Sequence, residues 1–247
     1  MDTKIKIGGV SYLNALPMLR GIEQSPVIKD IELSMNYPSI LAQQLRDGLI
    51  DIALLPVAAI PAIEGAHIVA DYGIAAYGEV ASVAIFSQVP MEDIESVYLD
   101  YQSRTSVMLA RLLLRDYWKK EVVLKPATEH FIEYINDKNA GVIIGDRALK
   151  QRNNFNYVYD LAAAWKDYTG LPFVFAAWVA NRELPADFVD AFNKANAAGM
   201  KFIDQIVSET LFPYYDLKKY YTENIHYYLD EEKKKGLNKF LELIQTL

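Results

Sequence analysis

The residues best suited to chemistry near the start of the chain are Ser11, Tyr12 and Asn14, which directly follow an apolar run over residues 5–10. That run predicts a strand, and a helix is expected a few residues further on. Loops at the carboxyl ends of strands hold small anionic ligands in α/β proteins, and the free N–H groups of a following helix attract negative charge. The Asn14 amide can therefore bind a ligand hydroxyl or carboxylate, or it can simply cap the helix.

A second polar loop contains Ser103, Arg104, Thr105 and Ser106 ahead of a strongly amphipathic stretch. Small hydroxyl side chains in this position are what a helix N-cap requires. The same hydroxyls, together with backbone N–H groups, can also bind a carboxylate. Arg104 can contact the ligand or face solvent, so both roles stay open for this loop.

Polar groups also lie near the ends of two later β segments. Gly145 and Asp146 close a buried-type strand over residues 140–144, where an acidic side chain is often functional in open α/β sheets. A salt bridge from Asp146 to Arg147, or a helix cap, is an equally plain explanation. Ser82 lies on a β-rich segment and can face either a ligand cleft or the interior.

The sequence lacks the residues and motifs of most cofactor and metal sites. There is no cysteine, which excludes disulfides, thiolate metal sites and cysteine nucleophiles. The histidines, His67, His130 and His226, show no metal-binding spacing. Neither a glycine-rich nucleotide motif nor a GxSxG nucleophile motif occurs. We therefore expect no metal and no cofactor.

Composition and charge narrow the range of partners. Of the 247 residues, 52% are hydrophobic, which is ample for a packed core. The net charge of −7 argues against a nucleic-acid partner, which usually requires a basic face. The amino terminus lacks a secretion signal, and no apolar run approaches the roughly 20 residues of a membrane helix. We expect a cytoplasmic protein, monomeric or dimeric, that binds a small molecule and no membrane.

Strand and helix signals alternate along the chain, which predicts an α/β fold with parallel strands. The expected strands are residues 4–10, 31–36, 50–56, 96–100, 122–125 and 140–145, and the expected helices are residues 17–23, 39–47, 107–118 and 128–136. Ser39 and Thr128 are expected to cap two of these helices, and Gly48 to end one of them.

Two β-rich segments, residues 79–88 and 172–181, separate these blocks. If both cross between lobes, they form a hinge, and such a protein closes around a ligand in its cleft. The first lobe then contains residues 1–87 and 175–247, with the C-terminal helices, and the inserted second lobe contains residues 88–174. The residues alone allow either a binding protein or an enzyme.

Four segments, taken in order, resemble the signatures of one enzyme family. Residues 11–17, Ser-Tyr-Leu-Asn-Ala-Leu-Pro, resemble its S-Y-L-N-x-x-P opening, and residues 103–106, 144–149 and 169–175 follow in the family's order. Together they are similar to the chorismate dehydratases of the futalosine route to menaquinone. The sister enzyme, 1,4-dihydroxy-6-naphthoate synthase, typically opens with S-P-C-P-N-D, which this chain lacks. One departure is residues 56–60, which read Pro-Val-Ala-Ala-Ile where many relatives have Ser-Ser.

The resemblance implies a two-lobed fold like that of type II periplasmic binding proteins. It also implies loss of water from chorismate to give 3-[(1-carboxyvinyl)oxy]benzoate, with catalytic roles for Asn14, near the departing hydroxyl, and for Asp146. The proton acceptor is either Asp146 or the substrate's own enolpyruvyl carboxylate, and we favour the latter. The implied substrate-binding residues are Ser11, Tyr12, Ser82, Ser103, Arg104, Thr105, Ser106, Gly145, Thr169, Gly170, Leu171 and Pro172.

Two alternatives accompany this reading. One is a solute-binding protein for a small aromatic or dicarboxylic anion, and the other is the sister naphthoate synthase. The segment 169–172 also has a plain structural explanation, because Gly170 and Pro172 suit the turn expected there.

Overall fold

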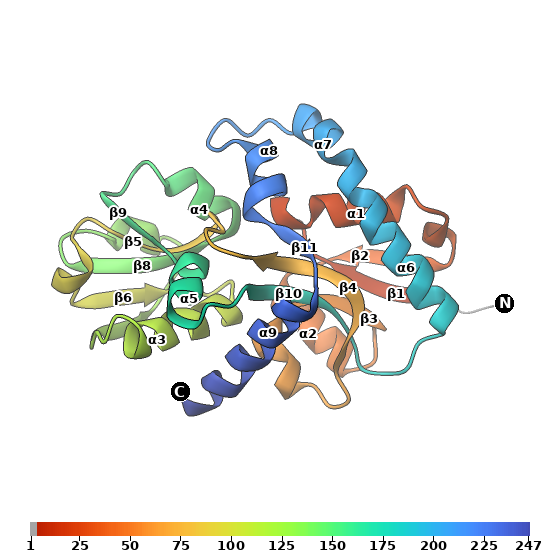
Figure 1. Ribbon diagram of the computed structural model, residues 1–247, viewed down its shortest axis with the longest axis horizontal. Coiled ribbons are helices and arrows are strands. Elements are labelled where there is room, and N and C mark those ends of the chain that lie inside the picture. Colours follow the sequence, from red (N-terminus) through yellow and green to blue (C-terminus); the bar gives the residue numbers. More distant parts are fainter. Residues whose placement is uncertain (1–3) are drawn as a thin grey trace. The chain divides into compact units, whose positions relative to one another are not determined.

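The computed structural model describes residues 4–247 and divides the chain into two compact units (Figure 1). The first unit contains Met1–Ala75 and Val174–Asp230, and the second contains Ala76–Phe173 and Glu231–Leu247. These units differ from the expected division at residues 76–87 and at the C-terminal helix, both of which belong to the second unit. The chain therefore passes between the units three times.

The first unit is built on a six-stranded sheet in the order β11-β4-β10-β3-β1-β2. β1 pairs in parallel with both β2 and β3, whereas β10 runs antiparallel to β3. The carboxyl ends of β1, β2 and β3 therefore meet at one edge of the sheet. The strands are β1 (Ile5–Gly9), β2 (Ile31–Met35), β3 (Ile52–Pro56), β4 (His67–Ala76), β10 (Phe173–Ala180) and β11 (His226–Tyr228).

The helices of the first unit begin and end as their sequences indicate, with one exception. Pro17 and Pro38 lie in the first turns of α1 and α2, where a missing N–H costs nothing, and Gly48 follows α2 with φ +68°. The predicted cap at Ser39 is wrong, because α2 starts at Pro38 and its N-cap is Tyr37. The helices are α1 (Leu16–Glu23), α2 (Pro38–Arg46), α6 (Ala186–Gly199), α7 (Ile203–Glu209) and α8 (Leu217–Lys219).

The second unit is built on a five-stranded sheet in the order β7-β6-β8-β5-β9. β6 is parallel to β7 and β8, and β5 is antiparallel to β8 and β9. The strands are β5 (Val83–Ser87), β6 (Ser96–Leu99), β7 (Val123–Pro126), β8 (Asn139–Ile144) and β9 (Tyr157–Asp160). The helices are α3 (Arg104–Asp116), α4 (Gly145–Gln151), α5 (Leu161–Thr169) and α9 (Glu231–Leu243).

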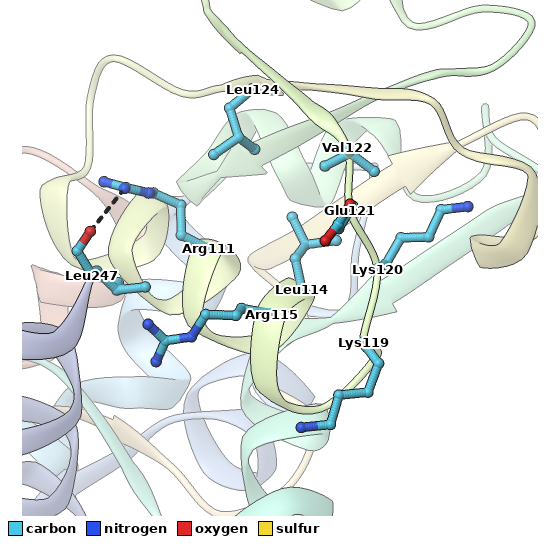
Figure 2. A pocket seen from close by; sticks show the side chains of 9 residues that line it. All are labelled: Arg111, Leu114, Arg115, Lys119, Lys120, Glu121, Val122, Leu124 and Leu247. Carbon is cyan, nitrogen blue, oxygen red and sulfur yellow. Dashed lines mark hydrogen bonds between the residues drawn. The ribbon is translucent and has the colours of Figure 1, made fainter.

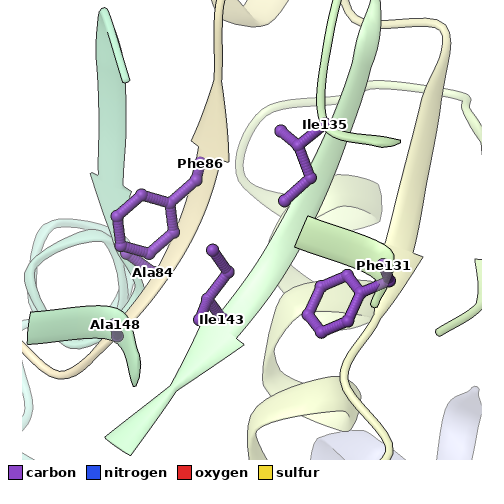
Figure 3. Close-up of a cluster of buried hydrophobic side chains, with 6 residues drawn as sticks. All are labelled: Ala84, Phe86, Phe131, Ile135, Ile143 and Ala148. Atoms are coloured by element: carbon purple, nitrogen blue, oxygen red, sulfur yellow. The ribbon is translucent and has the colours of Figure 1, made fainter. Parts of the chain in front are cut away.

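A hydrophobic cluster covers the sheet of the second unit (Figure 3). Phe86 and Ile143 come from neighbouring strands, and Phe131 and Ile135 from the segment that leads into β8. A Cβ atom at Gly141 would lie 2.5 Å from Ile135 Cδ1, so glycine lets that side chain pack directly on the strand.

The predicted helix over residues 128–136 is wrong. That segment forms only a 3-10 turn, Phe131–Tyr134, whose N-cap is His130 rather than Thr128. Backbone bonds three residues apart, from Phe131 N to Thr128 O and from Ile135 N to Ile132 O, tighten the chain before it enters β8. The apolar residues Phe131 and Ile135 of this segment pack on the sheet from a short turn instead of a helix.

α9 belongs to the second unit because its packing surface is there. The Phe240 ring lies 4.8 Å from the Phe173 ring and 6.1 Å from the Trp165 ring, measured between centroids. A Cβ at Gly236 would lie 2.0 Å from Pro172 O, so the helix backbone touches the turn before β10 directly. Within residues 4–247, no helix is both long and apolar enough to cross a membrane.

Candidate active site

Asn14 lies in the loop at the carboxyl end of β1, as the sequence predicts. A single 3-10 turn, Leu13–Ala15, connects β1 to α1, and its backbone is closed by a 3.0 Å bond from Ala15 N to Tyr12 O. Ser11 is exposed and Tyr12 is half-buried. These three predicted residues are therefore neighbours at the edge where parallel strands end.

The Asn14 side chain does not cap the helix. The N-cap of α1 is Ala15, and no side chain caps it. Asn14 Oδ1 is buried, yet it accepts no hydrogen bond from any group in residues 4–247. Leaving a buried acceptor unpaired costs about 1–3 kcal/mol, and such groups in native proteins usually have a functional reason. A ligand hydroxyl or N–H group would satisfy this oxygen.

Two glycines set the position of α1 and hence of the Asn14 loop. A Cβ at Gly21 would lie 2.2 Å from Ala195 O, and a Cβ at Gly199 would lie 2.0 Å from Pro17 O. The backbones of α1 and α6 therefore touch, and Figure 1 shows the two helices side by side. No larger residue fits at this crossing unless α1 moves.

In the second unit, Ser103 caps α3. Its Oγ accepts a hydrogen bond from Ser106 N at 3.2 Å and donates to Ser106 Oγ at 2.9 Å. Thr105 and Ser106 are buried, whereas Arg104 is exposed. The capping explanation is thus confirmed for Ser103, and a ligand role for this helix start stays a prediction.

Asp100, which the sequence did not indicate, joins two of the predicted segments. Its buried carboxylate accepts hydrogen bonds from Gln102 N at 2.9 Å and Ile144 N at 3.3 Å. It also accepts two bonds from Arg147 Nη2, at 2.8 and 2.7 Å. Burial raises the pKa of Asp100, and the Arg147 charge opposes that shift. Asp100 thus ties the loop before Ser103 to the start of α4, bringing two predicted segments together.

The segment from Gly145 to Arg147 opens α4 directly after β8. Gly145 has φ +63°, which favours glycine, and its N–H donates to Ser82 O at 2.7 Å. Asp146 is half-buried in the first turn, where a negative charge is favourable. Arg147 forms its salt bridge with Asp100. Ser82 is buried, and its contact with a ligand stays a prediction.

The turn after α5 has a sufficient structural explanation. Thr169 Oγ1 donates to Trp165 O at 2.8 Å and accepts from Leu171 N at 3.2 Å. Gly170 ends the helix with φ +74°, and Pro172 O accepts from Trp165 Nε1 at 3.1 Å. These groups serve the turn itself, and contact with a ligand stays a prediction for them.

Asp160, also missed, organises the backbone beside Ser82. Its carboxylate accepts from Val80 N at 3.2 Å and Ala81 N at 2.8 Å. It also caps α5 by accepting from Ala162 N at 3.0 Å and Ala163 N at 3.1 Å. Burial raises the pKa of Asp160 to about 6, although the backbone bonds oppose the shift. An aspartate before Leu-Ala-Ala-Ala is a helix-start signal that could have identified this role.

A pocket of about 520 Å³ in the second unit contains none of the predicted site residues (Figure 2). Its lining is basic, but Arg115 is already paired with Asp116 and Thr246. Lys120 Nζ donates to Glu92 O. In residues 4–247, no group of three or more His, Asp or Glu side chains is placed to hold a metal ion.

Comparison with known proteins identifies the family. Residues 5–246 match the protein family described as Menaquinone biosynthesis. The chain belongs to this family. A chorismate dehydratase from Thermus thermophilus is 30% identical over 199 residues, which cover 70% of this chain and 72% of the relative. A chorismate dehydratase from Campylobacter jejuni is 28% identical over 249 residues, 97% of each chain.

Solved structures confirm the predicted fold class of the family member. A protein from Archaeoglobus fulgidus superposes with a TM-score of 0.77 at 15% identity, covering 98% of this chain and 97% of its own. The periplasmic aliphatic sulphonate binding protein of Escherichia coli superposes with a TM-score of 0.65 at 13% identity, covering 100% and 93%. At these identities the likeness shows the fold alone, which is that of the periplasmic binding proteins.

Proposed function

We propose that this member of the family is a chorismate dehydratase, a carbon–oxygen lyase that removes water from chorismate to give 3-[(1-carboxyvinyl)oxy]benzoate. The main support for the proposal is the family match over residues 5–246, together with a chorismate dehydratase that aligns with 97% of this chain. The buried, unpaired Asn14 Oδ1 in the signature loop supports it independently.

The reaction needs orientation more than a cofactor. The ring hydroxyl leaves with its bonding electrons, a neighbouring ring carbon loses a proton, and the freed C–H electron pair completes an aromatic ring. Aromatisation supplies the driving force. Positioning of reacting groups can lower a barrier by several kcal/mol, and one fixed hydrogen-bonding group by about 3 kcal/mol more. Polar side chains on rigid strand ends can provide both.

We assign Asn14 to the departing hydroxyl. Its unpaired Oδ1 is an acceptor, and the substrate hydroxyl is a donor that would satisfy it. The other half of the amide can donate to the same oxygen as negative charge develops there. Such a contact strengthens in the transition state, which is what catalysis requires.

We assign one substrate carboxylate to the start of α3. Ser103, Thr105 and Ser106 carry hydroxyls there, and the helix dipole favours negative charge. Ser103 already uses its hydroxyl for the cap, so backbone N–H groups supply the remaining donors in this assignment.

The proton acceptor is either Asp146 or the enolpyruvyl carboxylate of the substrate, and we favour the substrate group. That carboxylate hangs beside the carbon that loses the proton. The Asp146→Asn variant then keeps kcat within a few-fold of the wild type. If Asp146 is the base instead, kcat falls by about 10²-fold or more, because general base catalysis contributes that much. Single-turnover kinetics with chorismate distinguish the two results.

The rival function is a solute-binding protein for a small aromatic or dicarboxylic anion, which the likeness to periplasmic binding proteins favours. Incubation of the pure protein with chorismate, followed by mass analysis and ultraviolet absorbance, separates the two functions. A product lighter by one water with an aromatic spectrum supports the dehydratase. Chorismate, or another anion, bound and recovered unchanged supports the binding protein. A cytoplasmic location, freedom from cofactors and the oligomeric state stay predictions.

A further inference from the structure

We propose that Arg147 binds the ring carboxylate of the substrate and that Asp100 orients it for this purpose. The inference rests on the proposed function for its substrate, but the geometry that carries it lies wholly within the second unit. Arg147 follows the candidate base Asp146 and was not among the substrate-binding residues that the sequence indicated, where it appeared only as a salt-bridge partner of Asp146.

Only one nitrogen of the Arg147 guanidinium is used by the protein. Nη2 donates to Asp100 Oδ1 at 2.8 Å and to Oδ2 at 2.7 Å. Within the described residues 4–247, Nε and Nη1 donate no hydrogen bond. The Arg147 side chain is 27% exposed, whereas that of Asp100 is completely buried. Nη2 is therefore anchored, whereas Nε and Nη1, which do not share an edge of the guanidinium, each keep an N–H group that can donate a charge-assisted hydrogen bond to a carboxylate.

The anchor holds the guanidinium in place before any ligand arrives. Asp100 is itself fixed by Gln102 N and Ile144 N, so it cannot swing with the arginine. The guanidinium carbon lies 5.4 Å from the Tyr101 ring centroid and 5.9 Å from that of Phe131, which restricts its plane. A pre-oriented arginine loses less conformational entropy on binding than a free one.

Arg104, the arginine that the sequence indicated, is not held in one orientation by a carboxylate in this way. It is exposed, and it makes no hydrogen bond within the part of the chain that the structure describes. Arg147 and the start of α3 are also linked through Asp100 and the loop before Ser103. In the second unit, Asp100 thus holds Arg147 in one orientation and connects it to the loop that precedes the Ser103 cap.

The ring carboxylate is the better partner because it takes no part in the reaction. A substrate-assisted mechanism needs the enolpyruvyl carboxylate to accept a proton, and a hydrogen-bonded arginine would make that group less basic. Arg147 therefore contributes binding and specificity rather than proton transfer.

The test compares Arg147→Lys and Arg147→Gln with Lys150→Gln, an exposed residue of the same helix. Both Arg147 variants are expected to raise KM for chorismate by about 10- to 100-fold while kcat changes only a few-fold, because charge-assisted bonds are lost. Lysine retains the charge next to Asp100 but lacks the planar guanidinium, which donates to Asp100 and to a ligand from different nitrogens. Lys150→Gln keeps both constants within about two-fold.

The preference for chorismate over its ring carboxamide is a second measurement, which would not change if Arg147 had only a structural role. Wild type is expected to prefer chorismate over its ring carboxamide by at least 10-fold, and both Arg147 variants are expected to lose most of that preference. An unchanged preference, or a KM within three-fold of the wild type, would overturn the inference. If Arg147→Gln does not fold, Arg147→Lys and the double variant Asp100→Asn/Arg147→Gln are measured in the same way.

Failure of the proposed function is recognised separately. If wild type does not convert chorismate, the dissociation constant of 3-[(1-carboxyvinyl)oxy]benzoate and that of its ring carboxamide are measured by calorimetry. Weaker binding of the carboxylate alone in the Arg147 variants supports the inference. Equal binding by wild type and variants, or no binding by any of them, overturns it.

Discussion

At the scale of single residues, the proposed function depends most on Asn14. The helix-cap explanation is wrong, since Ala15 is the N-cap of α1, and Asn14 Oδ1 is buried without a donor in residues 4–247. The ligand contact stays a prediction. A protein that keeps an unsatisfied acceptor in a loop at a strand end gains nothing in stability from it. We expect the unsatisfied oxygen to contribute to the reaction instead, by accepting a hydrogen bond from the substrate.

We expect Asn14→Ala to lower kcat by about 10²- to 10³-fold, the usual cost of removing one group that stabilises developing charge. The free energy of unfolding should stay within about 1 kcal/mol of the wild type, because no internal hydrogen bond is lost. Steady-state kinetics measure kcat, and urea unfolding measures the free energy of unfolding. Near-normal kcat would remove Asn14 from the mechanism.

The sequence could predict Asn14 because its signal is local: a polar residue between an apolar run and a helix. It could not predict Asp100, whose partner Arg147 is 47 residues away in the chain. The strand-end rule that indicated Asp146 applies equally to Asp100, at the end of the expected strand 96–100. Choosing between them required the fold, which shows which carboxylate is buried against an arginine.

At the scale of elements, the α1–α6 crossing positions the Asn14 loop. We expect Gly199→Ala to reduce the free energy of unfolding by about 1–3 kcal/mol, since the new methyl group would collide with Pro17 O. Ala191→Ser, on the exposed face of the same helix, should change it by less than about 0.5 kcal/mol. Equal stability of the two variants in urea would show that the crossing can relax.

Asp160 predicts a pH dependence of stability. Its pKa is about 6 in the folded protein against 3.8 for the ordinary group, so the folded state holds the proton more tightly. The resulting stabilisation is complete below about pH 4 and is lost as the pH rises through 6. Between pH 4.5 and 7 the loss is about 2 kcal/mol.

The measurement compares urea unfolding of the wild type and Asp160→Asn at both pH values. Asparagine does not titrate, so the difference in unfolding free energy between the two proteins should change by about 2 kcal/mol from pH 4.5 to pH 7. Parallel pH profiles would mean that Asp160 ionises normally in the folded chain.

β3, a continuous apolar run, was predictable from sequence because a central strand of this kind is buried on both faces. β4 was not predicted, since His67–Ala76 mixes polar, small and apolar residues without a clear period. The helix expected over residues 128–136 failed for a different reason. Phe131 and Ile135 pack closely over Gly141, and this packing accompanies a 3-10 turn rather than a helix.

At the scale of the whole molecule, the predicted α/β fold class is confirmed by the two sheets and by the likeness to periplasmic binding proteins. The unit boundaries follow from packing that sequence periodicity does not reveal. β5 pairs with β8 and β9, and α9 packs through Phe240 on Trp165 and Phe173, so both lie in the second unit.

A periplasmic sulphonate binding protein shares this fold, so the proposed function differs from binding alone in that this chain transforms its ligand. The direct test is the number of product molecules formed per protein molecule when chorismate is in large excess, with Asn14→Ala as the matched blank. We expect 3-[(1-carboxyvinyl)oxy]benzoate, one water lighter than chorismate, to accumulate far beyond the protein concentration in the wild type alone. Chorismate recovered unchanged from the wild type, whether or not it binds, would contradict the proposed function.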